Sequence, residues 1–94
     1  MAAIGVVTLE IVLQNSHSLK DKRHVVRSLK DRLRNKFNVA VAEIDCQDMW
    51  QRAVVAAVTV SADHTHAEKV LQSVEEEAAA LLGSELTGAA VEWM

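Results

Sequence analysis

The order in which hydrophobic spacing changes along the chain limits its fold more than any other feature. An apolar residue stands at every second position from Val7 to Leu13, which is typical of a strand with one buried face. Residues 19 to 37 instead place apolar side chains at steps of three and four, which predicts a helix. Extended runs at 39–45 and 53–60, a second helical stripe at 67–82 and a short strand at 86–93 follow.

The predicted helix ends carry capping signals. Ser18 can act as N-cap of the first helix, with the carboxylate of Asp21 in the first turn, where it favours the helix dipole. We expect this helix to end near Phe37, with Asn38 in the left-handed conformation. Asp63 can cap the second helix, and Gly83 stands where a C-terminal cap belongs.

The order strand, helix, strand, strand, helix, strand predicts an α+β fold. Right-handed crossovers place both helices on one face of a four-stranded antiparallel sheet, which gives a ferredoxin-like βαββαβ sandwich of two layers. No proline or long linker divides the sequence, so residues 1–94 are expected to form a single domain. A chain this short buries only about 60% of its unfolded surface, so its stability is expected to be modest.

Charge is strongly polarised along the chain, although the net charge is only -3. The segment from Lys20 to Lys36 holds eight of the ten basic residues against two acids, a net charge of +6, and the remainder carries -9. Five of these bases recur at alternating steps of three and four, which places them on one side of the helix, beside its apolar face. We call them the basic stripe: Lys20, Arg23, Arg27, Lys30 and Arg34.

Such a row could contact successive phosphates of a nucleic acid, and binding would then depend strongly on salt. The alternative is an ordinary solvated helix face whose charge is compensated by acids elsewhere. No pair of aromatic residues stands on a central strand to stack bases, and the whole chain is acidic. The predicted target is therefore the backbone or shape of RNA.

Lys22 falls near the apolar side of the first helix, where a lysine is unexpected unless its stem packs. Its ammonium would then reach a carboxylate, such as that of Glu43 or Asp45, or the solvent at the sheet edge. We expect a structural role, with the charged end of Lys22 extending outward.

The connection between the two middle strands contains a large aromatic residue. A protruding Trp50 would indicate a binding surface for a partner. The interpretation we favour from sequence is that Trp50 folds back over the end of the core, while Arg52 pairs with Asp45 or Asp48. The candidate interaction or structural residues of this connection are Gln47, Asp48, Trp50, Gln51 and Arg52.

No complete catalytic or metal-binding pattern is present, so we expect no enzyme, cofactor, metal or small-molecule substrate. An enzyme or metal protein built around His17, Cys46 and Asp48 stays open as an alternative, although their spacing matches no recognised site. A single cysteine and the lack of a signal-peptide pattern or an uncharged run of about 18 apolar residues predict a cytoplasmic protein outside the membrane.

The sheet face away from the helices is predicted to be uncovered, because the fold has only two layers. The first strand contributes several apolar residues to it, so a homodimer or another protein partner could bind there. Scattered β-branched residues chosen for strand propensity alone would explain the same pattern. The first-strand residues are Ile4, Val6, Thr8, Glu10 and Val12.

Four segments together resemble the YlxP family of small bacterial proteins: 16–23, 37–39, 41–43 and 47–53. The resemblance implies a ferredoxin-like fold and a bacterial cytoplasmic protein, often encoded among genes for translation and ribosome maturation. It implies no particular activity. Nine residues match the family pattern: Lys20, Lys22, Arg23, Glu43, Gln47, Asp48, Trp50, Gln51 and Arg52.

Two functions are therefore expected from the sequence. The first is a non-enzymatic protein that associates with RNA or a ribosomal subunit through the basic stripe. The alternative is a protein-interaction or homo-oligomerisation module that uses the open sheet face and Trp50.

Overall fold

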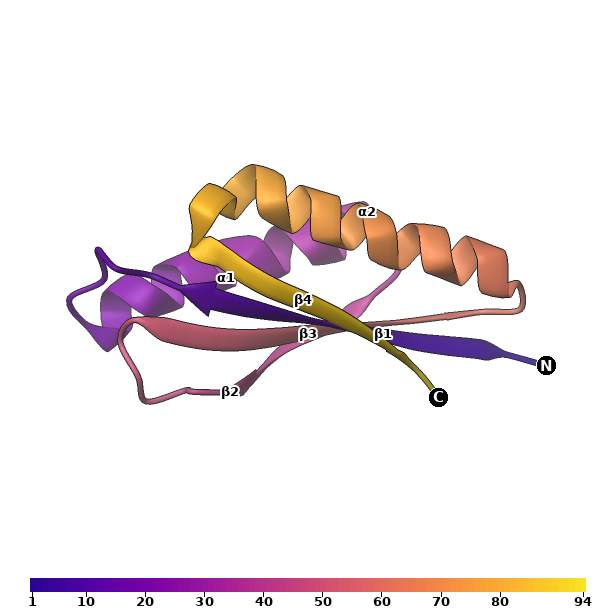
Figure 1. The fold of residues 1–94 in the computed structure, drawn as a ribbon, viewed down its shortest axis with the longest axis horizontal. Helices are drawn as coiled ribbons and strands as arrows, with labels where there is room; N and C mark the ends of the chain where they lie inside the picture. The colour runs from indigo at the N-terminus through magenta and orange to yellow at the C-terminus, as the bar shows by residue number, and fades with distance from the viewer.

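The computed structural model, which describes residues 1–94, confirms the predicted βαββαβ order (Figure 1). A single turn of 3-10 helix, η1, precedes the last strand. The elements are β1 (Ala3–Val12), α1 (Leu19–Lys36), β2 (Ala40–Asp45), β3 (Arg52–Ser61), α2 (His64–Leu82), η1 (Gly83–Glu85) and β4 (Leu86–Trp93).

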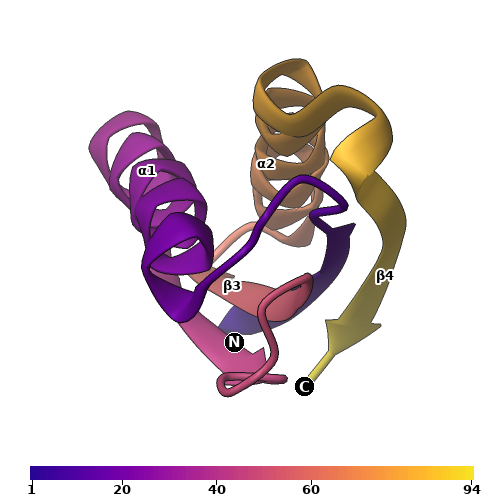
Figure 2. The same ribbon diagram turned by 90° about the vertical axis from the view of Figure 1, so that its left-hand side faces the viewer.

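The four strands form one antiparallel sheet in the order β2-β3-β1-β4, and both helices lie on the same face of it (Figure 1). This is the predicted ferredoxin-like arrangement. Seen from its end, the molecule has α1 on the β2 side of the sheet and α2 toward the β4 side (Figure 2). Each helix therefore lies near one edge of the sheet, and the opposite face is uncovered.

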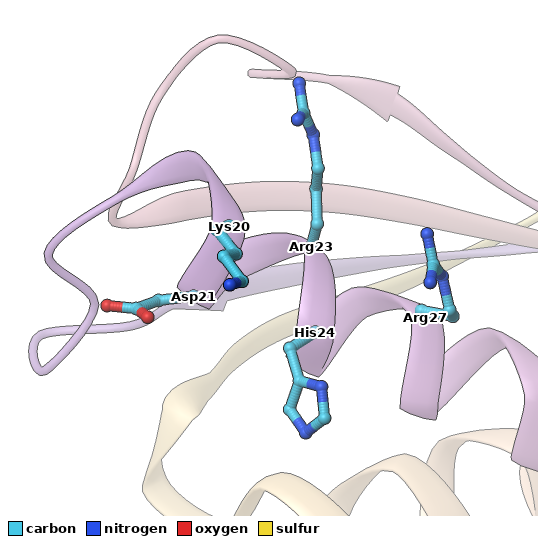
Figure 3. Close-up of a pocket in the computed structure, with 5 residues that line it drawn as sticks. All are labelled: Lys20, Asp21, Arg23, His24 and Arg27. Atoms are coloured by element: carbon cyan, nitrogen blue, oxygen red, sulfur yellow. The ribbon is translucent and has the colours of Figure 1, made fainter.

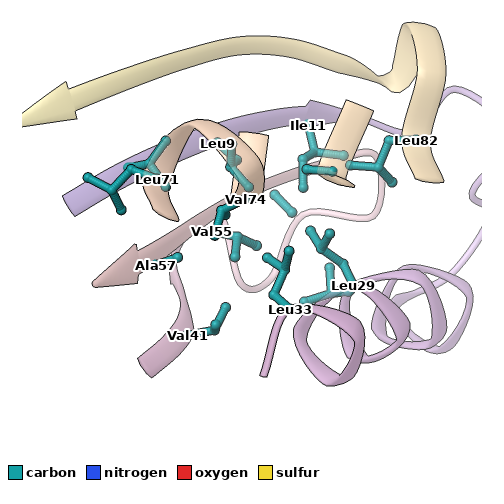
Figure 4. Packing of buried hydrophobic residues seen from close by; sticks show 14 of the residues in the cluster. Leu9, Ile11, Leu29, Leu33, Val41, Val55, Ala57, Leu71, Val74 and Leu82 are labelled. Atoms are coloured by element: carbon teal, nitrogen blue, oxygen red, sulfur yellow. The ribbon is translucent and has the colours of Figure 1, made fainter. Parts of the chain in front are cut away.

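The core lies between the helices and the sheet (Figure 4). The period-two pattern of β1 places Val7, Leu9 and Ile11 on the helix side, each no more than 1% exposed. Leu29 and Leu33 of α1 are fully buried against this layer. Burying each such side chain stabilises the fold by roughly 1.5–3 kcal/mol.

Three of the four predicted caps are confirmed. The Asp21 N–H donates to Ser18 Oγ at 3.0 Å, and the Thr65 N–H donates to Asp63 Oδ1 at 3.0 Å. Gly83 ends α2 with a φ of +58°, a conformation that costs a residue with a side chain more than it costs glycine.

The expectation of a left-handed Asn38 is wrong. The first helix ends at Phe37 in an extended conformation, and Cys46 is the only non-glycine residue with positive φ. The hydroxyl of Thr59 donates to the Asn38 carbonyl at 2.9 Å, which helps to fix the segment beside β3. The chain thus enters β2 without the reversal that a left-handed residue would provide.

Neither helix is apolar over a length sufficient to cross a membrane.

Candidate functional site

Lys22 is fully buried at the start of α1, with no exposed surface. Its ammonium donates to three backbone carbonyls, those of Cys46 at 2.6 Å and Gln47 at 3.1 Å in the β2–β3 connection and that of Arg52 at 3.2 Å at the start of β3. The expectation that Lys22 extends its charge outward is wrong, because these inward-facing oxygens replace the water around the ammonium. Its predicted structural role agrees with this geometry.

Of the two carboxylates predicted for Lys22, Glu43 is the partner. Its Oε2 lies 3.0 Å from Lys22 Nζ, as an ion pair without the alignment of a hydrogen bond. Glu43 stands on β2, so one lysine joins the first turn of α1 to both the second strand and the connection that follows it. This network fixes the N-terminal end of α1 over the sheet.

Gln51 ties the same connection to a second loop. Its side-chain Nε2 donates to the carbonyls of Gln14 and Ser16 at 3.3 and 3.2 Å, and its own carbonyl accepts from the Leu13 N–H at 2.8 Å. The predicted motif residues Gln47 and Arg52 are thus brought together around Lys22, and Gln51 ties their connection to the loop before α1. Asp48 is exposed and lies outside these contacts.

The favoured interpretation of Trp50 is wrong, because its side chain is 54% exposed instead of covering the core. Leu13 and Lys22 are each at most 2% exposed although Trp50 does not cover the core. The expected pairing of Arg52 is also wrong, since no ion pair joins it to Asp45 or Asp48. Arg52 contributes its backbone carbonyl to Lys22 instead.

The basic stripe lies along α1, with Lys30 half-buried and its other four members exposed. At its N-terminal end, an open hollow of about 570 Å³ is lined only by polar side chains (Figure 3). Arg23 and Arg27 extend to one side of the helix, and His24 points to the other side, toward α2. The hollow is lined by Lys20, Asp21, Arg23, His24 and Arg27.

Ion pairing separates the stripe from the remaining bases of α1. Glu77 of α2 lies 2.9 Å from Lys36 Nζ and 3.8 Å from Arg32 Nη1, and neither base belongs to the stripe. None of the five stripe residues lies within ion-pair distance of a carboxylate. Acids elsewhere in the chain therefore do not pair with the stripe, as they would if it were an ordinary solvated helix face with compensated charge.

One member of the stripe has a structural contact that spacing did not predict. Arg34 Nη2 donates to the carbonyl of Val41 on β2 at 2.8 Å. This bond holds the C-terminal half of α1 against the edge of the sheet. The side chains of the other four stripe residues make no such bond to the protein.

No group of three histidine, cysteine, aspartate or glutamate side chains lies close enough to hold a metal ion. The structure therefore does not bring His17, Cys46 and Asp48 together as metal ligands.

The open face of the sheet is partly exposed, as its two-layer design predicts. On β1, Ile4 and Glu10 are exposed, whereas Val6, Thr8 and Val12 are half-buried. The neighbouring strand β3 adds Val58 and Val60, 37% and 54% exposed. Ile44 and Met49, 52% and 44% exposed, add apolar surface in β2 and the following connection.

Sequence reasoning did not identify a groove of about 400 Å³ between α2 and the outer strand β4. The sequence does show negative charge concentrated outside α1, which points to the acidic residues of this groove. It does not show that apolar residues of α2 and β4 lie between them. The lining residues are Glu68, Leu71, Gln72, Glu75, Glu76, Val91 and Trp93.

Comparison with known proteins gives one family and one curated relative. Residues 4–90 match the family described as "Protein of unknown function (DUF503)". The relative is the uncharacterized protein YlxP of Bacillus subtilis (strain 168), 41% identical over 71 residues that cover 76% of this chain and 77% of the relative.

Solved structures show similarity in fold alone. The de novo designed protein Foldit4 matches with a TM-score of 0.61 at 10% identity, over 100% of this chain and 97% of that chain. A de novo design with a ferredoxin fold, LFR1 1, matches with 0.50 at 12% identity, over 100% and 84%. A C-terminal segment of the alpha subunit of aIF2 from Pyrococcus abyssi matches with 0.50 at 17% identity, over 98% and 48%.

Proposed function

The chain belongs to the DUF503 family, whose function is unknown, and for this member we propose a non-enzymatic role in binding RNA through the basic stripe of α1. The predicted resemblance to YlxP is confirmed by this membership. The proposed setting is the cytoplasm, with RNA of a ribosomal subunit as the candidate target.

The observation that carries the proposal is the lack of carboxylate partners along the stripe. A cation that already pairs with a surface carboxylate is less available to a phosphate, as is the case for Arg32 and Lys36 beside Glu77. Unpaired cations in a row are instead available to phosphates, whose neutralisation releases counterions and supplies most of the affinity for a nucleic-acid backbone.

The spacing of the stripe supports a backbone target. Residues at steps of three and four follow one side of the helix at about 5.4 Å per turn, so the stripe is a continuous row of positive charge that can neutralise several phosphates of one backbone. The Lys22 network supports the same proposal because it fixes the first turn of α1, so that Lys20 and Arg23 are presented from a rigid element.

Cosedimentation with isolated ribosomal subunits at low salt tests this function. The chain should sediment with a subunit, and reversing Arg23, Arg27 and Lys30 to Glu should abolish sedimentation. The matched control reverses Arg32, Arg52 and Lys69, which changes net charge equally but leaves the stripe intact. Sedimentation of the stripe variant at the wild-type level would contradict the proposal.

A second candidate function is a protein-interaction or homo-oligomerisation module. Its supporting observation is the exposed apolar surface at Ile44, Met49 and Trp50, together with Val58 and Val60 of the open sheet face. Sedimentation equilibrium over a hundredfold range of concentration, about two decades around micromolar, would show a rising mass for a homo-oligomer. The variant Trp50→Ala should lower that mass.

A further inference from the structure

The two edges of the sheet are protected to different degrees. At the β2 edge, α1 packs beside the strand, and Arg34 donates a hydrogen bond to the carbonyl of Val41, which is then not free to accept one from another strand. A register shift between Glu43 and Asp45 further interrupts that strand. Bulges and charged residues are the usual means by which proteins prevent another strand from pairing with an edge. The β2 edge is therefore poorly suited to strand addition.

The β4 edge lacks most of these protections. A register shift near Glu10 and Ile11 affects the start of β4, but Gly88 to Trp93 pairs regularly with β1. This regular part contains no proline or lysine, and its only charged residue is Glu92. A strand of small and apolar residues of this kind is an available template for an added strand.

The pairing pattern shows which backbone groups β4 presents outward. The Met94 N–H donates to the Ile4 carbonyl at 2.9 Å, which continues the β1–β4 ladder. Because hydrogen-bonded positions alternate in an antiparallel pair, Glu92 and Ala90 also point their backbone groups toward β1. The N–H and C=O groups of Ala89, Val91 and Trp93 point away from β1, toward the free edge.

The α2–β4 groove lies along this edge, with an apolar floor. Val91 and Trp93 belong to the floor, and both are partly exposed, at 44% and 38%. Gly5 gives the indole room, since a Cβ there would stand 2.6 Å from Trp93 Cζ3. The ring of His64 packs against the indole with 4.1 Å between centroids. The floor is therefore an aromatic surface in a defined position.

The α2 side of the groove is acidic. Glu75 and Glu76 have no cationic partner within ion-pair distance, and Glu68 has only His64, 3.8 Å away. A second copy of the chain fits poorly, because two-fold pairing of β4 with β4 would bring the two acidic helices together. A basic segment fits, because lysine or arginine can pair with these carboxylates and pack over Trp93.

We propose that the outer edge of β4 binds an extended basic segment of a partner protein by strand addition. The segment's backbone pairs with Ala89, Val91 and Trp93, and alternate side chains enter the α2–β4 groove beside Glu75 and Glu76. This site lies on the opposite edge of the sheet from the basic stripe, so it stands or fails independently of RNA binding. Basic arms of this kind are common in proteins that bind nucleic acid.

The first test uses a capped nonapeptide that alternates lysine and valine, with Trp93 fluorescence as the readout in a Trp50→Phe background. Saturable binding is expected. The matching glutamate–valine peptide should bind at least about tenfold more weakly, because the glutamates on the α2 side of the groove repel it. No saturable binding of the lysine peptide up to about millimolar concentration would overturn the proposal.

Two N-methylated versions of the lysine peptide separate strand addition from simple charge attraction. One carries N-methyl groups on its odd residues and the other on its even residues. Strand addition predicts that one version binds normally and the other loses at least about tenfold in affinity, because its blocked amides face β4. Equal binding of both versions would overturn the proposal.

Variants of the protein locate the site. Glu75→Lys with Glu76→Lys should weaken the lysine peptide by about tenfold or more and strengthen the glutamate peptide. The control, Asp31→Lys with Asp48→Lys, makes the same charge change away from the groove and should leave the ratio of the two affinities unchanged. Peptide-induced hydrogen-exchange protection at Ala89 and Val91 supports the site, whereas protection at β2 instead of β4 contradicts it.

Discussion

The two sides of α1 use basic residues in opposite ways. On the side facing the sheet, Lys22 is fully buried and surrounded by three carbonyls and the Glu43 carboxylate. On the outer side, Lys20 and Arg23 are exposed, and neither is among the bases that form an ion pair with a carboxylate. Residues of the same charge, one to two positions apart, therefore serve the fold in one case and are available to a ligand in the other.

The basic residues of α1 therefore form two groups, those paired within the fold and those left without a carboxylate partner. The buried ammonium of Lys22 bonds only to protein oxygens and is paired with Glu43, so a phosphate cannot contact it. An exposed, unpaired cation costs the fold little and keeps its interaction energy for a phosphate.

Lys22→Met should produce the largest loss of stability, about 3–5 kcal/mol in the free energy of unfolding, because it leaves Glu43 and three carbonyls without their cation. Urea denaturation followed by circular dichroism measures this change. The exposed Lys20→Met is the matched control and should change stability by less than about 0.5 kcal/mol. Similar values for the two variants would remove the distinction between the sides of the helix.

Leu29→Ala tests the apolar part of the same buried side. Leu29 is 0% exposed, so its truncation should cost about 2–5 kcal/mol through lost burial and a cavity. The salt dependence of RNA binding, measured at a temperature where the variant is folded, should be unchanged because no stripe residue is altered. A changed salt slope in folded protein would show that the two sides of α1 are coupled.

Arg34 belongs to both sides, and its replacement should therefore have two moderate effects. Arg34→Gln removes the bond to the Val41 carbonyl, which should cost about 0.5–1.5 kcal/mol of unfolding free energy. If Arg34 also contacts a phosphate, the slope of log Kobs against log salt should fall by about 0.7–0.9. A loss of stability with an unchanged slope would place Arg34 on the structural side alone.

The triple reversal of Arg23, Arg27 and Lys30 to Glu should have the smallest effect on stability, less than about 1 kcal/mol, because none of the three has a carboxylate partner to lose. Urea denaturation checks this expectation. A loss as large as that of Lys22→Met would show that the stripe supports the fold.

Local spacing in the sequence predicted the elements, both helix N-caps and the buried side of β1. These features depend on residues a few positions apart, such as Ser18 with Asp21. The stripe was predicted for the same reason, since its members share one helix. The unusual position of a lysine beside an apolar face suggested Glu43 or Asp45 as a partner of Lys22, and the structure selects Glu43.

Features set by distant parts of the chain could not be predicted. Trp50 is exposed in a connection whose backbone is held by Lys22 of another element, a contact that local spacing does not specify. The Arg34–Val41 bond depends on how α1 lies over the sheet edge, which spacing along α1 does not specify. The α2–β4 groove likewise requires the sheet order, which brings β4 beside β1.

The most direct test of the central claim is the salt dependence of binding to a ribosomal RNA fragment, measured for the wild type and two charge-matched variants. The stripe variant replaces Arg23, Arg27 and Lys30 with Gln, which removes three charges but keeps binding measurable. The control makes the same replacement at Arg32, Arg52 and Lys69. We predict that the stripe variant lowers the slope of log Kobs against log salt by about 2–3 units, whereas the control nearly preserves it. Equal loss in both variants would mean that net charge, not the unpaired stripe, governs binding, and would contradict the account.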